Sequence, residues 1–164
     1  MGFIFKSLLT KFSVVVYCLA EGDIVKYIGV DFGDARVGIA SSDLGGVIAS
    51  AVCILKVRGI EDAVAQTASK AIELGGQAFV IGLPKTTKGN DEYRAERTQR
   101  FADMIEEKTG LPVMFFDERF TSVEAVRYLS EGGVYGAKRK KVLDAVAAQI
   151  ILQSFLDSKE REGK

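Results

Sequence analysis

The sequence predicts an α/β protein with one mixed β-sheet that carries helices on both faces. Two patterns in its 164 residues lead to this fold class. Three apolar segments separated by short turns come first, which is typical of an antiparallel meander. From residue 60 onward, segments with helical periodicity alternate with short apolar strands, which is typical of parallel strands joined by crossover helices. The length suits one domain with a substantial core.

The meander occupies the first part of the predicted domain. Its strands are expected at Tyr27–Phe32, Arg36–Ser42 and 47–57. Gly33 and Asp34 supply a turn between the first two strands, and residues 43–46 supply the next turn. Because both connections are short, neighbouring strands are expected to pair antiparallel, as hairpins do.

The second part of the domain alternates helices with strands. Strands are expected at residues 78–82 and 113–116, and helices at residues 60–74, 91–109, 122–130 and 141–158. The first of these helices has one apolar face, formed by Ile60, Val64, Ala68, Ala71 and Ile72. The second is expected to point four side chains inward: Tyr93, Phe101, Met104 and Ile105. The last has a face formed by Val142, Ala145, Val146, Gln149, Ile150 and Gln153.

The two ends of the chain differ in composition from the domain predicted at residues 25–158. Residues 159–164 read as a charged, frayed tail. Residues 1–24 read as an N-terminal extension for which three explanations stay open. A translation start placed too early is favoured, with Val25 as the natural start; the others are a real extra element and a weak secretory signal.

Histidine is absent, and this restricts the chemistry of any active site. Its absence excludes Ser-His-Asp and Cys-His catalysis and every metal site that needs imidazole. The two cysteines, Cys18 and Cys53, cannot close a zinc site alone and do not suggest a disulfide framework. Cys53 lies in an apolar run and is expected to pack in the core. A reducing, cytoplasmic location fits this cysteine usage.

Acidic residues lie at the carboxyl ends of the first and the last predicted strands. Asp31 lies near the carboxyl end of the first strand, and Asp117 and Glu118 follow the last strand. If these strands are parallel, their carboxyl ends share one edge of the sheet, where sites of α/β proteins form. Asp144 lies in the last helix among apolar neighbours and is a further candidate for the same cluster.

Such a cluster suits divalent metal and phosphodiester cleavage. Carboxylate oxygens are the ligands that Mg²⁺ and Mn²⁺ prefer, and two ions roughly 4 Å apart can serve both the attacking and the leaving oxygen. Each acid also has a plainer explanation. Asp31 can be a strand end, Glu118 a surface partner of Arg119, and Asp144 an acid near a helix N-terminus. Four other acids are assigned to caps, turns or solvated charge: Asp34, Asp43, Asp62 and Asp117.

Taken together, these segments resemble the YqgF family, described both as Holliday junction resolvases and as nucleases that mature the 5′ end of pre-16S ribosomal RNA. The resemblance rests on GVDFG at 29–33, RVGIA at 36–40, VIGLP at 80–84 with Gly89, DERFTSVEA at 117–125, and residues 141–152 around Asp144. It runs from about residue 26 to residue 156, which is nearly the whole chain.

The resemblance implies an RNase H-like fold. The five-stranded mixed sheet would have the order 3-2-1-4-5, with strand 2 antiparallel and helices on both faces. It also implies that Asp31, Glu118 and Asp144 are the catalytic and metal-binding set, with two Mg²⁺ or Mn²⁺ ions as cofactors. Leu143 stands where some relatives carry a second acid, so a fourth metal ligand stays open.

Basic residues near these segments are candidates for contact with a nucleic-acid backbone. The expected contacts are Lys85, Lys88, Arg94, Arg119, Thr121, Lys138, Arg139, Lys140 and Lys141. The lysines at 85 and 88 can equally belong to a plain surface loop, and the basic run before Asp144 to a solvated helix start. Arg94, Arg97 and Arg100 can instead pair with Glu96 and Asp103.

The sequence therefore predicts a metal-dependent nuclease acting on structured RNA or branched DNA. Processing of pre-16S rRNA is favoured, and resolution of Holliday junctions is the alternative; the chain would act as a monomer or homodimer. Two other classes stay open. One is a nucleic-acid-binding module without catalysis, and the other is an ATP-handling domain, which would need a second such lobe. The zero net charge, from 22 basic and 22 acidic residues, counts against a nonspecific basic coat, and no apolar run is long enough for a membrane span.

Overall fold

The protein was analysed as a computed structural model that describes residues 25–83, 90–117 and 137–162, without the side chains of residues 90–91, 137–145 and 162. The elements run β1 (Tyr27–Phe32), β2 (Arg36–Ser42), β3 (Ala49–Lys56), α2 (Ile60–Glu73), β4 (Ala78–Leu83), α3 (Asn90–Thr109), β5 (Val113–Asp117) and α5 (Ala137–Glu162). Within these described ranges, no helix combines the length and the apolar character that a membrane crossing requires. The helix expected at residues 122–130 lies outside them.

The five strands form one sheet in the order β3-β2-β1-β4-β5. β2 pairs antiparallel with both β1 and β3, whereas β1, β4 and β5 pair parallel. The expected order and directions are therefore confirmed. β3 begins two residues later than expected, because the backbone amides of Val47 and Ile48 donate to the Asp43 carboxylate and belong to the turn. Asp43 is thus a turn residue, as the sequence suggested.

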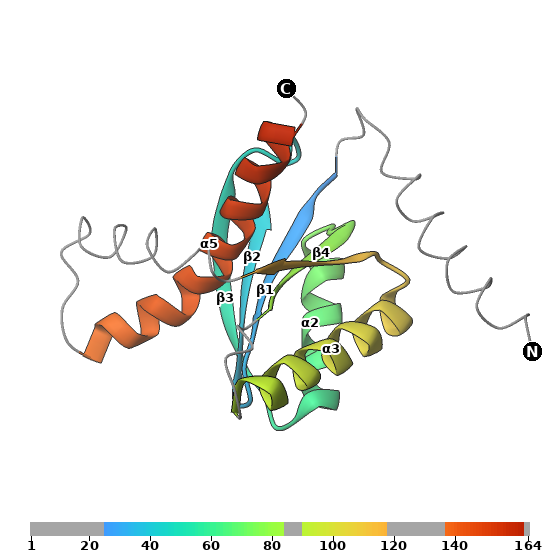
Figure 1. Ribbon diagram of the computed structural model, residues 1–164, viewed down its shortest axis with the longest axis vertical. Coiled ribbons are helices and arrows are strands. Elements are labelled where there is room, and N and C mark those ends of the chain that lie inside the picture. The colour runs from blue at the N-terminus through green and yellow to red at the C-terminus, as the bar shows by residue number, and fades with distance from the viewer. Residues whose placement is uncertain (1–24, 84–89, 118–136, 163–164) are drawn as a thin grey trace, which may run out of the picture.

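Helices α2 and α3 cover one face of the sheet (Figure 1). Ile28 and Val30 of β1 point into the core beneath them, together with Phe101 and Ile105 of α3. The prediction that two residues of these helices lie in the core is wrong. Ile72 and Tyr93 are 75% and 58% exposed, because each lies outside the buried stripe of its helix, Ile72 by about 40° and Tyr93 by about 80°.

Helix α5 covers the opposite face, so the expectation of helices on both faces is confirmed (Figure 1). The core beneath it includes Tyr27, Val80, Ala148 and Leu152. The helix is longer than expected at both ends, running from Ala137 to Glu162. The tail expected to fray from residue 159 is thus helical as far as Glu162, and Lys159 donates to the Tyr27 hydroxyl at 2.6 Å.

Two glutamines fix α5 to the outer part of the sheet. The Gln153 side chain accepts from the Ala49 amide at 2.8 Å and donates to the Val47 carbonyl at 3.0 Å. One turn earlier, the Gln149 side chain donates to the Ala49 carbonyl at 3.0 Å. Because these bonds satisfy backbone groups at the start of β3, they set the position of the helix along the sheet.

Candidate nuclease site

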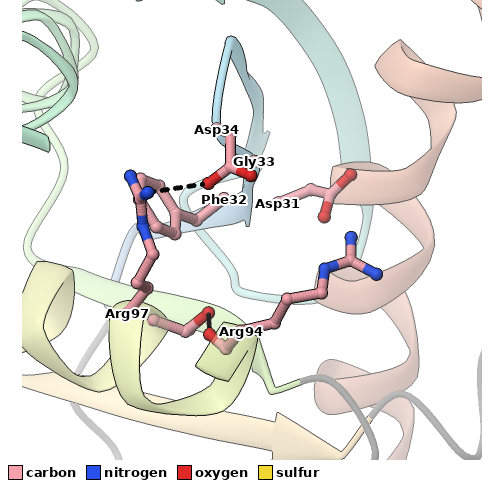
Figure 2. Close-up of a pocket in the computed structure, with 7 residues that line it drawn as sticks. Asp31, Phe32, Gly33, Asp34, Arg94 and Arg97 are labelled. Atoms are coloured by element: carbon pink, nitrogen blue, oxygen red, sulfur yellow. Dashed lines mark hydrogen bonds and ion pairs between the residues drawn. The ribbon is translucent and has the colours of Figure 1, made fainter. Parts of the chain in front are cut away.

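Asp31 lies at the carboxyl end of β1 and belongs to the sheet face that α5 covers. Side chains alternate along a strand. Ile28 and Val30 point to the side of α2 and α3, where Phe32 stacks on Phe101 with ring centroids 4.4 Å apart. Tyr27 points to the α5 side, and Asp31, four residues later in the same strand, lies on that side too. The Asp31 side chain is half-buried, and Figure 2 shows its carboxylate directed toward a helix of that face.

Gly29 lets α5 approach β1 more closely than any larger residue would. A Cβ atom at Gly29 would lie 2.7 Å from Leu152 Cβ and 2.8 Å from the Ala148 carbonyl oxygen. These distances are shorter than normal contacts, so the helix rests directly on the strand backbone at this point. A glycine inside a strand commonly marks such an approach. The sequence contained this signal, and its meaning was missed.

The same contact determines which part of α5 lies beside Asp31. Lys159 meets Tyr27, and Ala148 and Leu152 meet Gly29, so α5 runs antiparallel to β1. Position 144 is one turn before Ala148 on the same helix face, a rise of about 6 Å. Asp31 is two residues beyond Gly29, a rise of about 6.6 Å along the strand. The backbone thus brings position 144 level with Asp31, although the Asp144 side chain is outside the described residues.

β5 ends at the same edge of the sheet as β1 and β4. Leu83 pairs with Asp117 in the parallel register of β4 and β5. Met114 and Phe116 pack on the α5 side of the sheet, whereas Val113 packs on the other side, against the core under α2 and α3. Because side chains alternate along a strand, Asp117 lies on the same side as Val113. Glu118 follows directly and lies outside the described residues. Of the three expected acids, the structure therefore describes the side chain of Asp31 alone.

A pocket opens beside Asp31, between the end of β1 and helix α3. It is lined by Asp31, Phe32, Gly33, Asp34, Arg94, Arg97 and Thr98 (Figure 2). Arg97 pairs with Asp34 at 3.2 Å, donates to the Tyr93 hydroxyl at 3.3 Å, and lies over the Tyr93 ring at 5.8 Å. The bond with Tyr93 and then the charge of Asp34 raise the pKa of the Arg97 guanidinium. The Arg97–Asp34 pair was not foreseen, because its partners are 63 residues apart.

The arginines of α3 do not make the pairings considered from the sequence. Arg97 pairs with Asp34, and Arg100 pairs with Glu61 of α2 at 3.9 Å, instead of with Glu96 or Asp103. Asp103 accepts from the Gln99 side chain. Arg94 is exposed and extends its guanidinium toward the side of the pocket where the Asp31 carboxylate lies (Figure 2).

The other expected nucleic-acid contacts are only partly described. Lys85, Lys88, Arg119 and Thr121 lie outside the described residues. Lys138, Arg139, Lys140 and Lys141 occupy the first turns of α5, where the backbone alone is described. These four cations therefore immediately precede the turn of α5 that carries Asp144.

The donor chemistry around Asp31 fits a divalent cation such as Mg²⁺. A half-buried carboxylate at a strand end offers hard oxygen ligands, and the backbone brings a second acidic position level with it. Among the side chains that the structure describes, no group of three acids or cysteines gathers into a metal site. A complete site would thus need Glu118 and Asp144.

Comparison with known proteins places these features in context. A family model described as "RuvX: Holliday junction resolvase" matches residues 25–158. A protein of Pelotomaculum thermopropionicum is 38% identical over 138 residues, which cover 84% of this chain and 90% of that protein. One of Chloroflexus aggregans is 41% identical over 132 residues, which cover 80% and 93%. Both are named "Putative pre-16S rRNA nuclease".

A solved structure shows the same fold. RuvC of T. thermophilus, in complex with a Holliday junction substrate, superposes with a TM-score of 0.56 over 83% of this chain and 96% of that chain. The two sequences are 13% identical, so the likeness concerns the fold alone. The RNase H-like architecture expected from the sequence is confirmed.

Proposed function

This chain belongs to the RuvX family, described as Holliday junction resolvases, and from that membership we propose how it cuts nucleic acid and which substrate it takes. The chain is a hydrolytic nuclease. We propose that Asp31, Glu118 and Asp144 are its catalytic and metal-binding residues, and that residues 25–158 form the nuclease domain. The observation that carries this assignment is the close approach of α5 to Gly29, which brings the Asp144 position level with Asp31.

The three acids would hold divalent metal, and each is contributed by a different element. Nucleases of this fold class generally use divalent ions, and we propose two Mg²⁺ or Mn²⁺ ions here. Bound metal would supply an activated water and stabilise negative charge on the leaving oxygen. Asp31 comes from the end of β1, Asp144 from α5, and Glu118 from the segment after β5. Without metal, three carboxylates gathered at one site would repel each other, so a site of this kind would need a bound cation.

Basic residues on two sides of Asp31 would hold the phosphate backbone. Arg94 extends toward Asp31 from α3, and the run from Lys138 to Lys141 precedes Asp144 on α5. In the sequence, Lys85 and Lys88 come shortly after β4, and Arg119 and Thr121 come shortly after β5. Because such contacts read the backbone and not the bases, we expect recognition by nucleic-acid shape.

The proposed substrate is the 5′ end of pre-16S rRNA. The curated relatives, 38% and 41% identical, carry that name, and each is matched over at least nine tenths of its length. A nuclease with this role would work in the cytoplasm, where the free thiol of Cys53 is in keeping with a reducing environment. Resolution of branched DNA is the second candidate, favoured by the description of the family model.

The Asp31→Asn variant tests the proposed site. We expect it to lower Mg²⁺- or Mn²⁺-dependent cleavage of a structured RNA by about 100-fold or more, because the neutral amide is a weak metal ligand. Cleavage is followed by gel electrophoresis of end-labelled RNA, with and without chelator.

Asp43→Asn is the matched control for this experiment. Asp43 lies in the turn after β2, at the opposite edge of the sheet, where its carboxylate accepts from two backbone amides. We expect the control to cleave like the unaltered chain. If Asp31→Asn cleaves as fast as the control in a preparation free of other nucleases, Asp31 is not a metal ligand and the proposed site is wrong.

A further inference from the structure

The arginines beside the proposed site differ in whether they already have an acidic partner. Arg97 is paired with Asp34 at 3.2 Å, and Arg100 is paired with Glu61 at 3.9 Å. Among the side chains that the structure describes, Arg94 has no ion pair, although it lines the same pocket as Asp31. A positive charge therefore stands beside a proposed metal-binding carboxylate without being neutralised by another acid of the described pocket.

The position of Arg94 follows from the periodicity of α3. Arg94, Thr98, Phe101 and Ile105 are spaced by four, three and four residues, so they lie on one face of the helix. The last three are buried against the sheet. Arg94 continues this face by one further turn toward the start of the helix. The Thr98 hydroxyl donates a hydrogen bond to the Arg94 carbonyl at 2.9 Å and so links these two turns. The Arg94 guanidinium therefore lies on the Asp31 side of the pocket, as Figure 2 shows.

We propose that Arg94 couples metal binding at Asp31 to binding of the substrate phosphate. This inference rests on the proposed function, because it assumes that Asp31 is a metal ligand. A guanidinium stays charged at every physiological pH, so its field always opposes a cation placed at Asp31. A phosphodiester has the opposite charge, and a guanidinium can bind two of its oxygens at once.

Because of these two effects, Arg94 changes the metal affinity of the site in opposite directions, depending on whether a phosphate is present. Without a phosphate, Arg94 lowers the affinity of the site for metal. With a phosphate between the guanidinium and the metal, Arg94 stabilises the complex that contains both ligands. Metal and substrate then raise each other's affinity by the same factor, as linkage requires. The site would hold metal firmly mainly when nucleic acid is in place.

Mn²⁺ binding to the Arg94→Gln variant tests this proposal without measuring catalysis. Free Mn²⁺ is followed by electron paramagnetic resonance, first with metal alone and then with a two-nucleotide DNA that chromatography shows to stay intact. We expect the variant to bind Mn²⁺ alone about three- to tenfold more tightly than the unaltered chain. We expect the tightening caused by the dinucleotide, about five- to tenfold in the unaltered chain, to be lost.

Two controls separate a local effect from a general change in charge. Arg100→Gln removes the same charge from the same helix, at a position paired with Glu61, and is expected to change neither quantity more than about twofold. A dinucleotide whose bridging phosphate is an uncharged methylphosphonate is expected to leave Mn²⁺ affinity unchanged in every variant.

The result that overturns the proposal is equal coupling in Arg94→Gln and in the unaltered chain. Weaker Mn²⁺ binding by Arg94→Gln in the absence of dinucleotide also overturns it, because Arg94 would then support the site instead of opposing metal. Both outcomes leave the proposed function intact if Asp31→Asn abolishes Mn²⁺ binding. If Asp31→Asn binds Mn²⁺ normally, the proposed metal site itself fails.

Discussion

Thr67 of α2 has a completely buried hydroxyl that finds no hydrogen-bond partner among the described residues. Burying a hydroxyl without a partner costs free energy, whereas a methyl group of similar size at the same place would not. We therefore expect Thr67→Val to raise the free energy of unfolding by about 1 kcal/mol. In a chain of this length, that corresponds to a melting temperature higher by about 3 °C, measured by thermal denaturation.

Thr98→Val provides the comparison for this prediction. Thr98 is also buried, but its hydroxyl donates to the Arg94 carbonyl at 2.9 Å. Losing that bond should lower the free energy of unfolding by about 1 kcal/mol, so the two variants should shift the melting temperature in opposite directions. A drop in melting temperature for Thr67→Val would show that its hydroxyl has a partner after all.

Single side chains were also where prediction from sequence was least successful. Tyr93, which is expected to point inward, lies on the exposed side of α3 and contacts Arg97. Ile72 follows buried Ala71 and is turned about 100° away from it, which takes it out of the core. Helical periodicity identified which residues share a face. It could not fix the width of the face that the sheet covers, since that depends on packing.

Helix α5 and strand β1 form the contact on which the proposed site depends. A methyl group at Gly29 would collide with the Ala148 carbonyl oxygen, which belongs to the backbone and cannot rotate away. We expect Gly29→Ala to displace α5 and to lower the free energy of unfolding by about 2 kcal/mol. Because the same contact sets the level of Asp144, Mn²⁺ affinity should also fall, by about tenfold or more. Urea denaturation and metal titration of the folded variant measure the two effects.

Gly75→Ala is the control that distinguishes a loss of folding stability from a loss of metal binding. Gly75 ends α2 with a φ of 67°, and no atom lies within 4 Å of the position where a Cβ would stand. Alanine there should cost about 1 kcal/mol through backbone strain alone and should leave Mn²⁺ affinity unchanged. Should both alanine variants bind Mn²⁺ like the unaltered chain, close approach of α5 at Gly29 is not what positions the metal-binding residues.

At the scale of the whole molecule, the sequence predicted the sheet well and the site only in part. The short turns after β1 and β2 required antiparallel pairing, and the helical periodicity after β3 required crossovers to parallel strands. Parallel strands in turn bring Asp31 and the end of β5 to one edge. Nothing local in the sequence fixes how α5 crosses the sheet. The roles of Gly29, Gln149 and Gln153 became visible through contacts between distant segments.

The chain as a whole carries no net charge, with 22 basic and 22 acidic residues, so its overall field does not draw it to nucleic acid. Binding must then depend on local cations around the site, and both RNA and DNA backbones can bind such cations.

Depletion of the protein in the source cell distinguishes the two substrates. We expect 16S precursors with extended 5′ ends to accumulate, as measured by mapping RNA 5′ ends, and the unaltered chain to restore maturation where Asp31→Asn does not. If 16S 5′ ends stay mature while branched DNA accumulates, the substrate is the Holliday junction. The proposed metal-binding acids would then act in recombination.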